Sequence, residues 1–257
     1  MLLVFDVGNS ETTVGLFDEA RLVGHWRLPT LSQRSVMETR AWLMHTLHHA
    51  ALAASDVTAV AIASVVPAAV EPIVQSCELA FGQAPLLVTA HSALPLEVAV
   101  EQPSAVGIDR LLNTLAAHQL FGVDAICVDA GTATTLDCVT GTGVFLGGVI
   151  MPGVLTAATS LLANTAQLSL SQFTAPGHAM GTNTTDCLRA GIWFGAAEAI
   201  DGVVRRLVSE WPGSSTPLVI ATGGFSGALS GLCQSFARVE PALTLHGVRL
   251  AHEHLTR

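Results

Sequence analysis

Apolar residues fall along the chain in two kinds of run. Short unbroken stretches are typical of buried strands, and stretches with apolar positions three or four residues apart are typical of helices. In the first half the short stretches predict strands at 2–6, 14–17, 22–28, 57–65 and 86–88. Helical spacing covers 36–53, 68–81 and 109–120. Strands interspersed with helices in this way indicate an α/β fold.

The same order of elements begins again near the middle of the chain. VFDVG at 4–8 matches CVDAG at 127–131, and the threonine pair at 12–13 matches the pair at 134–135 with one residue dropped. In both copies a strand ends in aspartate, a glycine turn rich in hydroxyls follows, and a second strand begins. This repeat indicates an internal duplication.

The duplication predicts two α/β domains, the first at 1–117 and the second at 118–257. We expect the second domain to hold a helix at 187–211 and a strand at 217–221. That strand ends in a further glycine turn, ATGGFSG at 221–227.

The composition is that of a core-rich globular protein, because half of the 257 residues are hydrophobic and 12% are charged. A net charge of −9 argues against nucleic acid or an anionic membrane surface as the main partner. The N-terminal pattern does not fit a signal peptide, and no apolar stretch is long enough for a transmembrane helix. Five cysteines without a CxxC pair indicate reduced thiols, so we expect a cytoplasmic protein.

Arginine supplies all the permanent positive side-chain charge, because the sequence contains no lysine. P-loop NTPases and protein kinases need a lysine on the phosphates, and Schiff-base or pyridoxal-phosphate chemistry needs one as the amine. The sequence excludes these classes. A protein of this composition that handles nucleotide phosphates must use backbone amides, hydroxyls, a metal ion or arginine.

The glycine turn after Asp6 can hold phosphate without lysine. Gly8 lets the backbone turn tightly and bring amide N–H groups toward an anion, and the side chains at 9–13 offer further donors. Asp6 can hold a hydrated Mg²⁺ that neutralises a triphosphate. One such motif alone is more often a plain hairpin turn. Two copies at matching positions favour the interpretation that the turns bind one nucleotide. The glycine turn at 221–227 then suits the adenosine end of that nucleotide, or is a helix-start turn without a ligand.

A further candidate is GIDR at 107–110, at the start of a predicted helix. The helix dipole and Arg110 favour the charged form of Asp109. A carboxylate of ordinary pKa is ionised at pH 7 and can accept the proton of an alcohol that attacks phosphorus. The alternative interpretation is a capping aspartate beside a surface arginine.

The full set of motifs resembles the type III pantothenate kinases, within the ATPase superfamily of actin, hexokinase and Hsp70. DVGNSETTVGLF, SVVP, PSAVGIDR, VDAGTATTLD, GGVIMPG, GTNTT and ATGGF occur in the family's order and approximate spacing over nearly the whole chain. The resemblance implies two RNase H-like domains with mixed sheets around a nucleotide cleft. It implies ATP-dependent phosphorylation of pantothenate to 4′-phosphopantothenate, the first step of coenzyme A biosynthesis. It also implies a homodimer with the site at the subunit interface.

The resemblance also implies roles for individual residues. Asp109 is expected to be the catalytic base, Asp129 to bind a monovalent cation (K⁺ or NH₄⁺), and Asp6 to support the Mg²⁺ of ATP through water. The expected pantothenate-binding residues are Gly107, Ile108, Asp109, Arg110 and Thr184. The expected ATP-binding residues are Asp6, Val7, Gly8, Asn9, Ser10, Glu11, Thr12, Thr13 and Thr132.

Several alternatives stay open at the level of sequence. The chain has no tyrosine, whereas many family members carry one near the position of Val100, so one wall of the substrate pocket must differ. Two other functions are a superfamily kinase for another small alcohol or acid and a non-catalytic regulatory homologue. The GIDR motif favours pantothenate as the substrate. The presence of Asp6, Asp109 and Asp129 argues against a non-catalytic homologue. A chaperone-type ATPase would need a substrate domain for which no residues remain.

Three features have plain structural interpretations beside the functional ones. Thr184 or Thr185 can be a helix N-cap, and Asp137 can be a strand-end carboxylate. The span 138–185 carries no Asp, Glu, Lys or Arg, which suits either a dimer interface or a core.

Histidine is abundant, with ten residues in the chain. His45, His48 and His49 fall in one predicted helix, and His252 and His254 lie near the C-terminus. A spacing of three or four can place two histidines on one helix face as metal ligands. We expect instead a solvated or interface helix face.

Overall fold

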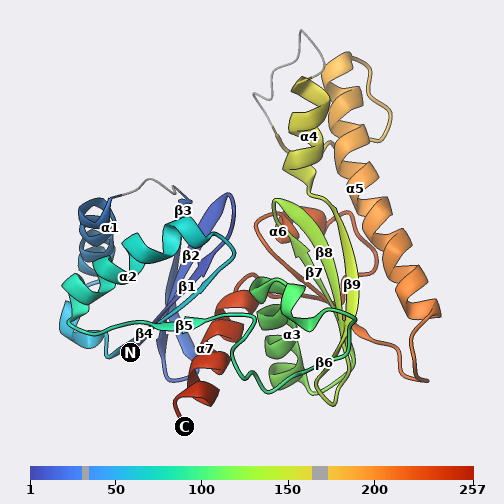
Figure 1. Cartoon of the computed structure of the whole chain (residues 1–257). Coiled ribbons are helices and arrows are strands. Elements are labelled where there is room, and N and C mark those ends of the chain that lie inside the picture. Colours follow the sequence, from blue (N-terminus) through green and yellow to red (C-terminus); the bar gives the residue numbers. More distant parts are fainter. Residues whose placement is uncertain (31–34, 164–172) are drawn as a thin grey trace. The chain divides into compact units, whose positions relative to one another are not determined.

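The predicted strands and helices form two α/β units, each folded around its own mixed sheet (Figure 1). The computed structural model describes residues 1–30, 35–163 and 173–257. Within these ranges, no helix combines the length and the apolar character needed to cross a lipid bilayer.

The first unit comprises residues 1–119 together with 243–257. Its sheet strands are β1 (Leu2–Val7), β2 (Glu11–Asp18), β3 (Arg21–Pro29), β4 (Ala59–Ser64) and β5 (Leu86–Val88). The two-residue strand β6 (Glu97–Val98) falls in the same residue range but is not part of this sheet. Its helices are α1 (Val36–His49), α2 (Pro67–Phe81), α3 (Ile108–Phe121) and α7 (Leu243–Leu255), with short 3-10 turns at Ala54–Asp56 and Pro103–Ala105.

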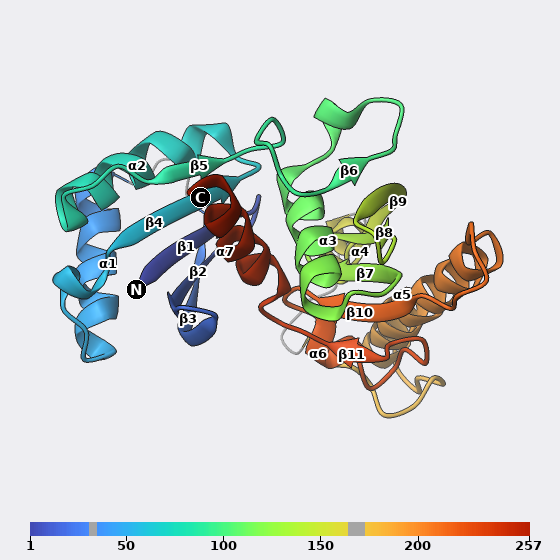
Figure 2. The ribbon, with the colours of Figure 1, turned by 90° about the horizontal axis from the view of Figure 1, so that it is seen from below.

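The sheet of the first unit has the order β3-β2-β1-β4-β5, with β1 antiparallel to β2 and parallel to β4. Side chains alternate across it, as the period of a strand requires. Leu3, Phe5 and Leu16 pack with Leu43 of α1 and Ile73 of α2 on one face. Figure 2 shows α1 and α2 on this side and α7 on the other.

Helix α7 covers the second face of this sheet. Gly15 of β2 leaves room for Leu245, and the ring of Phe17 meets His246 edge to face at 5.1 Å. The sequence pattern assigned 243–257 to the second domain, whereas the structure groups this segment with the first unit. Helical periodicity identifies an apolar face but not the sheet on which it packs. The predicted boundary between residues 117 and 118 lies two residues from the division of the units between 119 and 120, and both positions fall inside α3.

The second unit comprises residues 120–242. Its strands are β7 (Ala125–Ala130), β8 (Ala133–Val139), β9 (Val144–Pro152), β10 (Leu218–Thr222) and β11 (Arg238–Val239). Its helices are α4 (Val154–Ala163), α5 (Thr184–Ser209) and α6 (Ser226–Leu229).

The two units share one strand topology. Strands β9-β8-β7-β10-β11 repeat the order β3-β2-β1-β4-β5, again with an antiparallel first pair and a parallel second pair. In the second unit Ile126, Val128 and Leu136 pack against Trp193 and Ile200 of α5. The matching topology agrees with the internal repeat in the sequence.

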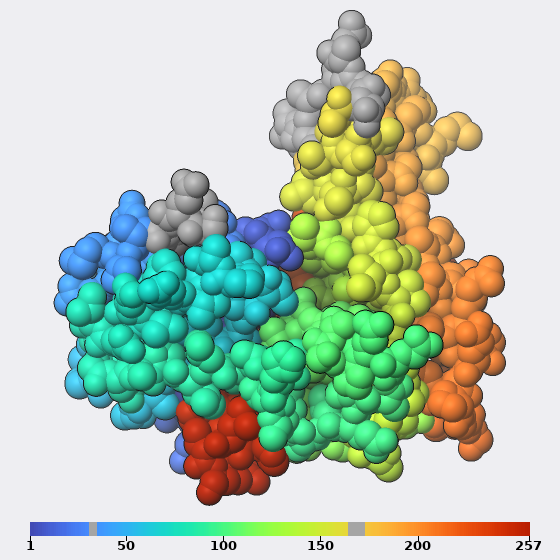
Figure 3. All heavy atoms as spheres, in the orientation of Figure 1, coloured from blue at the N-terminus to red at the C-terminus, as the bar shows by residue number. Residues whose placement is uncertain are grey.

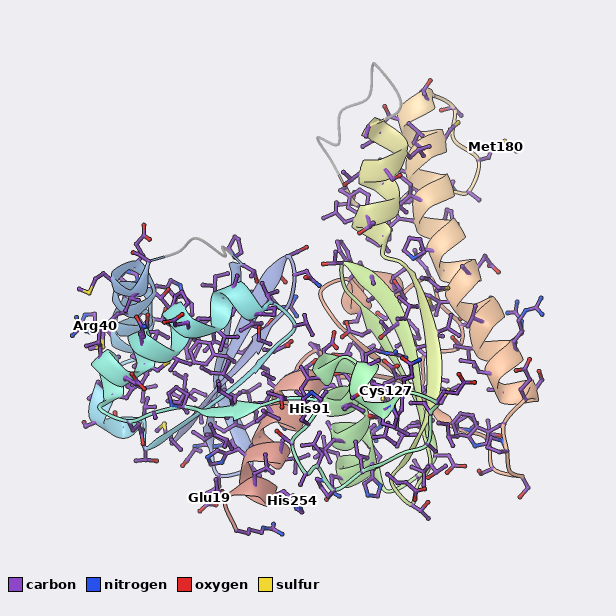
Figure 4. All side chains as sticks on the ribbon, viewed as in Figure 1. Glu19, Arg40, His91, Cys127, Met180 and His254 are labelled. Atoms are coloured by element: carbon purple, nitrogen blue, oxygen red, sulfur yellow. The ribbon has the colours of Figure 1, made fainter. Side chains whose placement is uncertain are left out.

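Helices α4 and α5 run side by side within the second unit and extend past its sheet (Figures 1 and 3). Helix α5 is 26 residues long. Large apolar side chains are exposed on this part of the unit, among them Leu155, Leu161 and Met180, and Met180 is labelled in Figure 4. The charge-free span predicted as interface or core therefore contains exposed apolar surface, and part of it, 164–172, lies outside the described residues.

Candidate active site

The first candidate turn joins β1 to β2. The amide of Gly8 donates to the carbonyl of Glu11 at 3.0 Å, and a Cβ on Gly8 would meet that oxygen at 3.0 Å, so the turn is as tight as the sequence predicts. Asn9 and Ser10 are exposed at its tip, and Asp6 is partly exposed just before it. Asp6 pairs with Thr13 across the strands, which places these two side chains on one face.

Thr12 does not join Asp6 and Thr13. It is 5% exposed, and its hydroxyl lies 2.8 Å from that of Thr30 on the sheet face packed against α1 and α2. Successive residues of a strand point to opposite faces, so the expected row of hydroxyl donors is divided between two faces. Glu11 lies beside Arg27 at 3.5 Å on the exposed side.

Asp109 lies in the first turn of α3. Its Oδ1 accepts the backbone N–H of Arg110 at 2.9 Å, and the carbonyl of Gly107 accepts the first helical hydrogen bond, from Leu111. A Cβ on Gly107 would lie 2.5 Å from Asp109 Oδ1, so glycine is required for this carboxylate position. Gly107 and Asp109 therefore act together structurally.

The pKa of Asp109 differs from the ordinary value expected from its sequence context. Burial raises the pKa of this carboxyl, and the opposing effects of the Arg110 N–H and guanidinium do not cancel that rise. The neighbouring arginine and helix start were visible in the sequence. The burial that outweighs them comes from tertiary packing.

Helix α3 is fixed to the first unit through α7. Thr244 donates to Asn113 at 2.8 Å, and a Cβ on Gly247 would lie 2.2 Å from the carbonyl oxygen of Leu112. The two helices therefore cross at close range, and α7 in turn covers the face of β1 that carries Asp6. Sequence reasoning did not identify Gly247, because no local motif marks a glycine at a helix crossing.

The second candidate turn joins β7 to β8. The amide of Gly131 donates to the carbonyl of Ala133 at 3.0 Å. This bond corresponds to the Gly8–Glu11 bond of the first turn but spans one residue fewer, because the second copy lacks one residue. Thr132 is exposed at the tip. Its carbonyl accepts the N–H of Gly153 at 3.2 Å and the hydroxyl of Thr156 at 2.5 Å, so the start of α4 holds this turn.

Hydroxyl groups flank Asp129 on both neighbouring strands. Asp129 pairs with Thr135 of β8 and with Thr222 of β10. The Thr135 hydroxyl donates to Asp137 at 2.9 Å, and the buried Thr222 hydroxyl has no partner among the described residues. Asp137 is a fully buried carboxylate inside β8, not one at a strand end. Thr222 was not singled out from sequence, although a hydroxyl just before a glycine turn is a usable signal.

The TGGF turn closes against Asp129. A Cβ on Gly223, which has φ of +87°, would lie 2.3 Å from Asp129 Oδ1. Phe225 donates its N–H to the carbonyl of Ala130 at 3.0 Å. Cys127, two residues before Asp129 and labelled in Figure 4, is fully buried, and burial raises the pKa of its thiol. This thiol is therefore inert structural packing.

Thr184 is the first residue of α5 and is exposed. The prediction that Thr184 or Thr185 caps the helix is wrong, because Asn183 accepts the N–H of Asp186 at 3.0 Å and is the N-cap. Arg189 holds the preceding segment by donating to Thr174. Thr184 itself therefore does not cap α5.

The candidate residues divide between the units. The first unit carries Asp6 to Thr13 and Gly107 to Arg110, and the second carries Asp129, Thr132 and Thr184. Among the described residues, no group of three or more His, Cys, Asp or Glu side chains is arranged to hold a metal ion. Hydroxyls, backbone oxygens, water and phosphate are further ligand types that a cation at Asp6 or Asp129 can take.

Two solved structures resemble the whole chain. A Campylobacter jejuni protein named as a Baf family transcriptional activator has a TM-score of 0.60 and 17% identity, over 99% of this chain and 100% of that one. Component A of (R)-2-hydroxyglutaryl-CoA dehydratase from Acidaminococcus fermentans has a TM-score of 0.55 and 13% identity, over 100% and 99%. These likenesses concern fold alone, and they confirm the predicted actin-like α/β class with two mixed sheets.

Comparison of sequences is more specific. The family model of type III pantothenate kinase matches residues 2–206. The type III pantothenate kinase of Acidothermus cellulolyticus is 40% identical over 98% of both chains, and that of Moorella thermoacetica is 34% identical over 100% of both. The chain therefore belongs to the type III pantothenate kinase family.

Proposed function

We propose that Asp109 accepts the alcohol proton in the reaction of this enzyme. As a member of its family, the chain phosphorylates pantothenate with ATP to give 4′-phosphopantothenate in coenzyme A biosynthesis. The observation that carries the assignment is the partly buried Asp109 carboxylate, which accepts the Arg110 N–H at the start of α3 and whose pKa is raised by desolvation. A raised pKa brings the carboxylate nearer to the working pH and makes it a better proton acceptor.

The proposed ATP site uses no lysine. The turn residues from Asp6 to Thr13, together with Thr132, are proposed to bind the phosphates. The exposed Asn9, Ser10 and Thr132 would do so through their side chains and backbone amides. Thr12 contributes only backbone to this site, because its hydroxyl is engaged with Thr30.

A kinase that uses ATP needs a divalent cation, and we propose Asp6 as the residue that supports Mg²⁺, through water. Its carboxylate is partly exposed at the end of β1 and is a ligand type that Mg²⁺ accepts. When bound, Mg²⁺ neutralises charge on the β- and γ-phosphates. The contribution of the chain is the fixed position of Asp6 beside the glycine turn.

Asp129 is proposed to bind a monovalent cation, K⁺ or NH₄⁺. The register that places Thr135 and Thr222 on either side of Asp129 supports this proposal, because all three offer oxygen ligands. Thr135 gives its only hydroxyl proton to Asp137, so its oxygen can accept but cannot donate toward Asp129. When bound, the cation adds positive charge against the triphosphate in a protein without lysine.

The proposed pantothenate site comprises Gly107, Ile108, Arg110 and Thr184. We also propose a homodimer whose site is completed across subunits and a cytoplasmic location. The exposed apolar side chains along α4 and near α5 support the dimer. All five cysteines lie in the described part of the chain, and no disulfide joins any of them there, which supports a reducing compartment.

The test is pantothenate-dependent ADP release with Mg²⁺, measured in K⁺ and in Na⁺, for wild type, Asp109→Asn and Asp18→Asn. Asp18 is an exposed carboxylate paired with Arg21 and serves as the matched control. We expect turnover in K⁺, a loss of about a hundredfold or more in Asp109→Asn, and no loss in Asp18→Asn. The acidic limb of the rate profile should lie above the ordinary aspartate pKa of about 3.9.

Three outcomes would contradict the proposal. Asp109→Asn that retains most of its turnover would remove Asp109 as the base. Equal turnover in K⁺ and Na⁺ would remove the monovalent cation from Asp129. Turnover with another small alcohol in place of pantothenate would identify a sister kinase of the same superfamily.

A further inference from the structure

Two exposed histidines approach each other closely on α1. The Nε2 atoms of His45 and His49 lie 3.0 Å apart, and the ring centroids are 4.3 Å apart. These residues are four apart, so they lie one turn from each other on one face of the helix. His48 is also exposed, but its ring centroid is 6.0 Å from that of His49.

The separation of the two nitrogens is that of a metal chelate. Imidazole nitrogens bind Zn²⁺ and similar ions at about 2.0–2.1 Å, so two of them lie about 2.9 Å apart at a right-angled metal centre and about 3.3 Å apart at a tetrahedral one. The observed 3.0 Å lies between these values. The helix therefore holds both nitrogens at a separation suitable for chelation.

We propose that His45 and His49 form a surface site for a borderline divalent transition metal ion, such as Ni²⁺, Cu²⁺ or Zn²⁺. Neutral imidazole suits these ions, whereas Mg²⁺ prefers oxygen ligands. The two rings supply two ligands, and water completes the coordination shell. The net charge of −9 attracts cations to the protein as a whole.

The protons in this site balance without an added reactant. In the metal-free pair one Nε2 carries a proton and donates it to the other. On metal binding, the neutral ring that carries its proton on Nε2 changes to the tautomer with the proton on Nδ1. Both Nε2 lone pairs are then available to the metal. Two neutral rings bind the ion without net proton release.

The proposal is tested by calorimetric titration of Ni²⁺ into the tag-free full-length chain, in the presence of a large excess of Mg²⁺. The variants are His45→Gln and His49→Gln, with His48→Gln as the matched control on the same helix. Glutamine is a good helix former, so these exposed substitutions leave α1 folded. The thermal midpoint of each variant with and without Ni²⁺ gives a second measurement, because an ion that binds the native helix stabilises it.

We expect about one Ni²⁺ per chain at the pair, with an affinity that falls on the order of tenfold or more when either ring is removed, since the second ligand acts at a high effective concentration. His48→Gln should keep the wild-type affinity and the Ni²⁺-dependent rise in thermal midpoint. Ni²⁺ binding that survives both His45→Gln and His49→Gln, or no binding to the wild type, would overturn the proposal.

Discussion

Replacing Gly107 by alanine should separate the position of Asp109 from the stability of the fold. The new Cβ would lie 2.5 Å from Asp109 Oδ1, whereas ordinary van der Waals contact begins at 3.4 Å. The carboxylate is the end of a side chain and can rotate away, so it should move by about 1 Å. A displacement of that size at a catalytic group costs about a hundredfold in rate, or about 2.7 kcal/mol of activation free energy.

The cost to stability should be small by comparison. Gly107 is the residue whose carbonyl accepts the first hydrogen bond of α3, and alanine is a poorer cap there than glycine by at most about 1 kcal/mol. For a chain of this size such a loss lowers the thermal midpoint by about 2–4 °C. Catalysis and stability should therefore respond to this substitution very differently.

The assay is steady-state ADP release with saturating pantothenate, together with thermal unfolding, for Gly107→Ala and for Gly231→Ala. Gly231 is an exposed glycine whose added Cβ would meet no atom within 4 Å, so it is the matched control. We expect kcat to fall in Gly107→Ala with little change in KM for ATP, and Gly231→Ala to behave as wild type. A Gly107→Ala enzyme with kcat within about threefold of wild type would refute the tight coupling of this glycine to the base.

Two further predictions concern stability. Gly247→Ala should lower the thermal midpoint by about 5 °C or more, since its Cβ would lie 2.2 Å from a backbone oxygen that cannot rotate away. Gly195→Ala is the control: its Cβ would lie in open space on α5, so this variant should be neutral or slightly stabilising. Equal changes in thermal midpoint for the two variants would contradict the close crossing of α3 and α7. Hydrogen bonds from the Ser215 hydroxyl, the Gly141 N–H and the Trp211 indole lower the pKa of Asp124 in the folded state. The carboxylate therefore contributes its whole stabilisation at pH values above its pKa in the unfolded chain, and this stabilisation is lost as pH falls through the lower pKa of the folded state. Urea unfolding should show Asp124→Asn less stable than wild type at pH 7 by about 1 kcal/mol or less, because the carboxylate is only partly buried. The difference in unfolding free energy should disappear on acidification. A gap that is constant with pH would show that the carboxylate charge is not what matters.

The local patterns of the sequence predicted most of the elements. Strands at 2–6 and 14–17 and helices at 68–81 and 109–120 agree with β1, β2, α2 and α3 to within a few residues. The helix predicted at 36–53 ends instead at His49, because the chain leaves helical geometry at Ala51, where φ is +57°. The one-residue deletion between the two turns was visible in the sequence and reappears as a shorter hydrogen-bonded turn.

The site was predictable only as far as it is local. Both glycine turns and the start of α3 were visible because residue type and spacing within a few positions determine such turns. The alternation of side chains along a strand predicts that Thr12 and Thr13 lie on opposite faces of the sheet. The hydrogen bond of Thr12 to Thr30 and the burial of Thr12 depend, however, on the packing of α1 and α2 over that face. The raised pKa of Asp109 likewise depends on desolvation by burial, which the local sequence does not show.

The sequence by itself determined the two-fold repeat, the lysine-free composition, the order of strands and helices, and the family to which the motifs point. Tertiary structure alone decided that α7 packs on the first sheet, that Gly247 admits Leu112 at a helix crossing, and that Thr222 stands beside Asp129. The physical reason is range. Backbone preference and side-chain periodicity act over a few residues, whereas burial, crossing distance and strand register are set by partners far away in the chain.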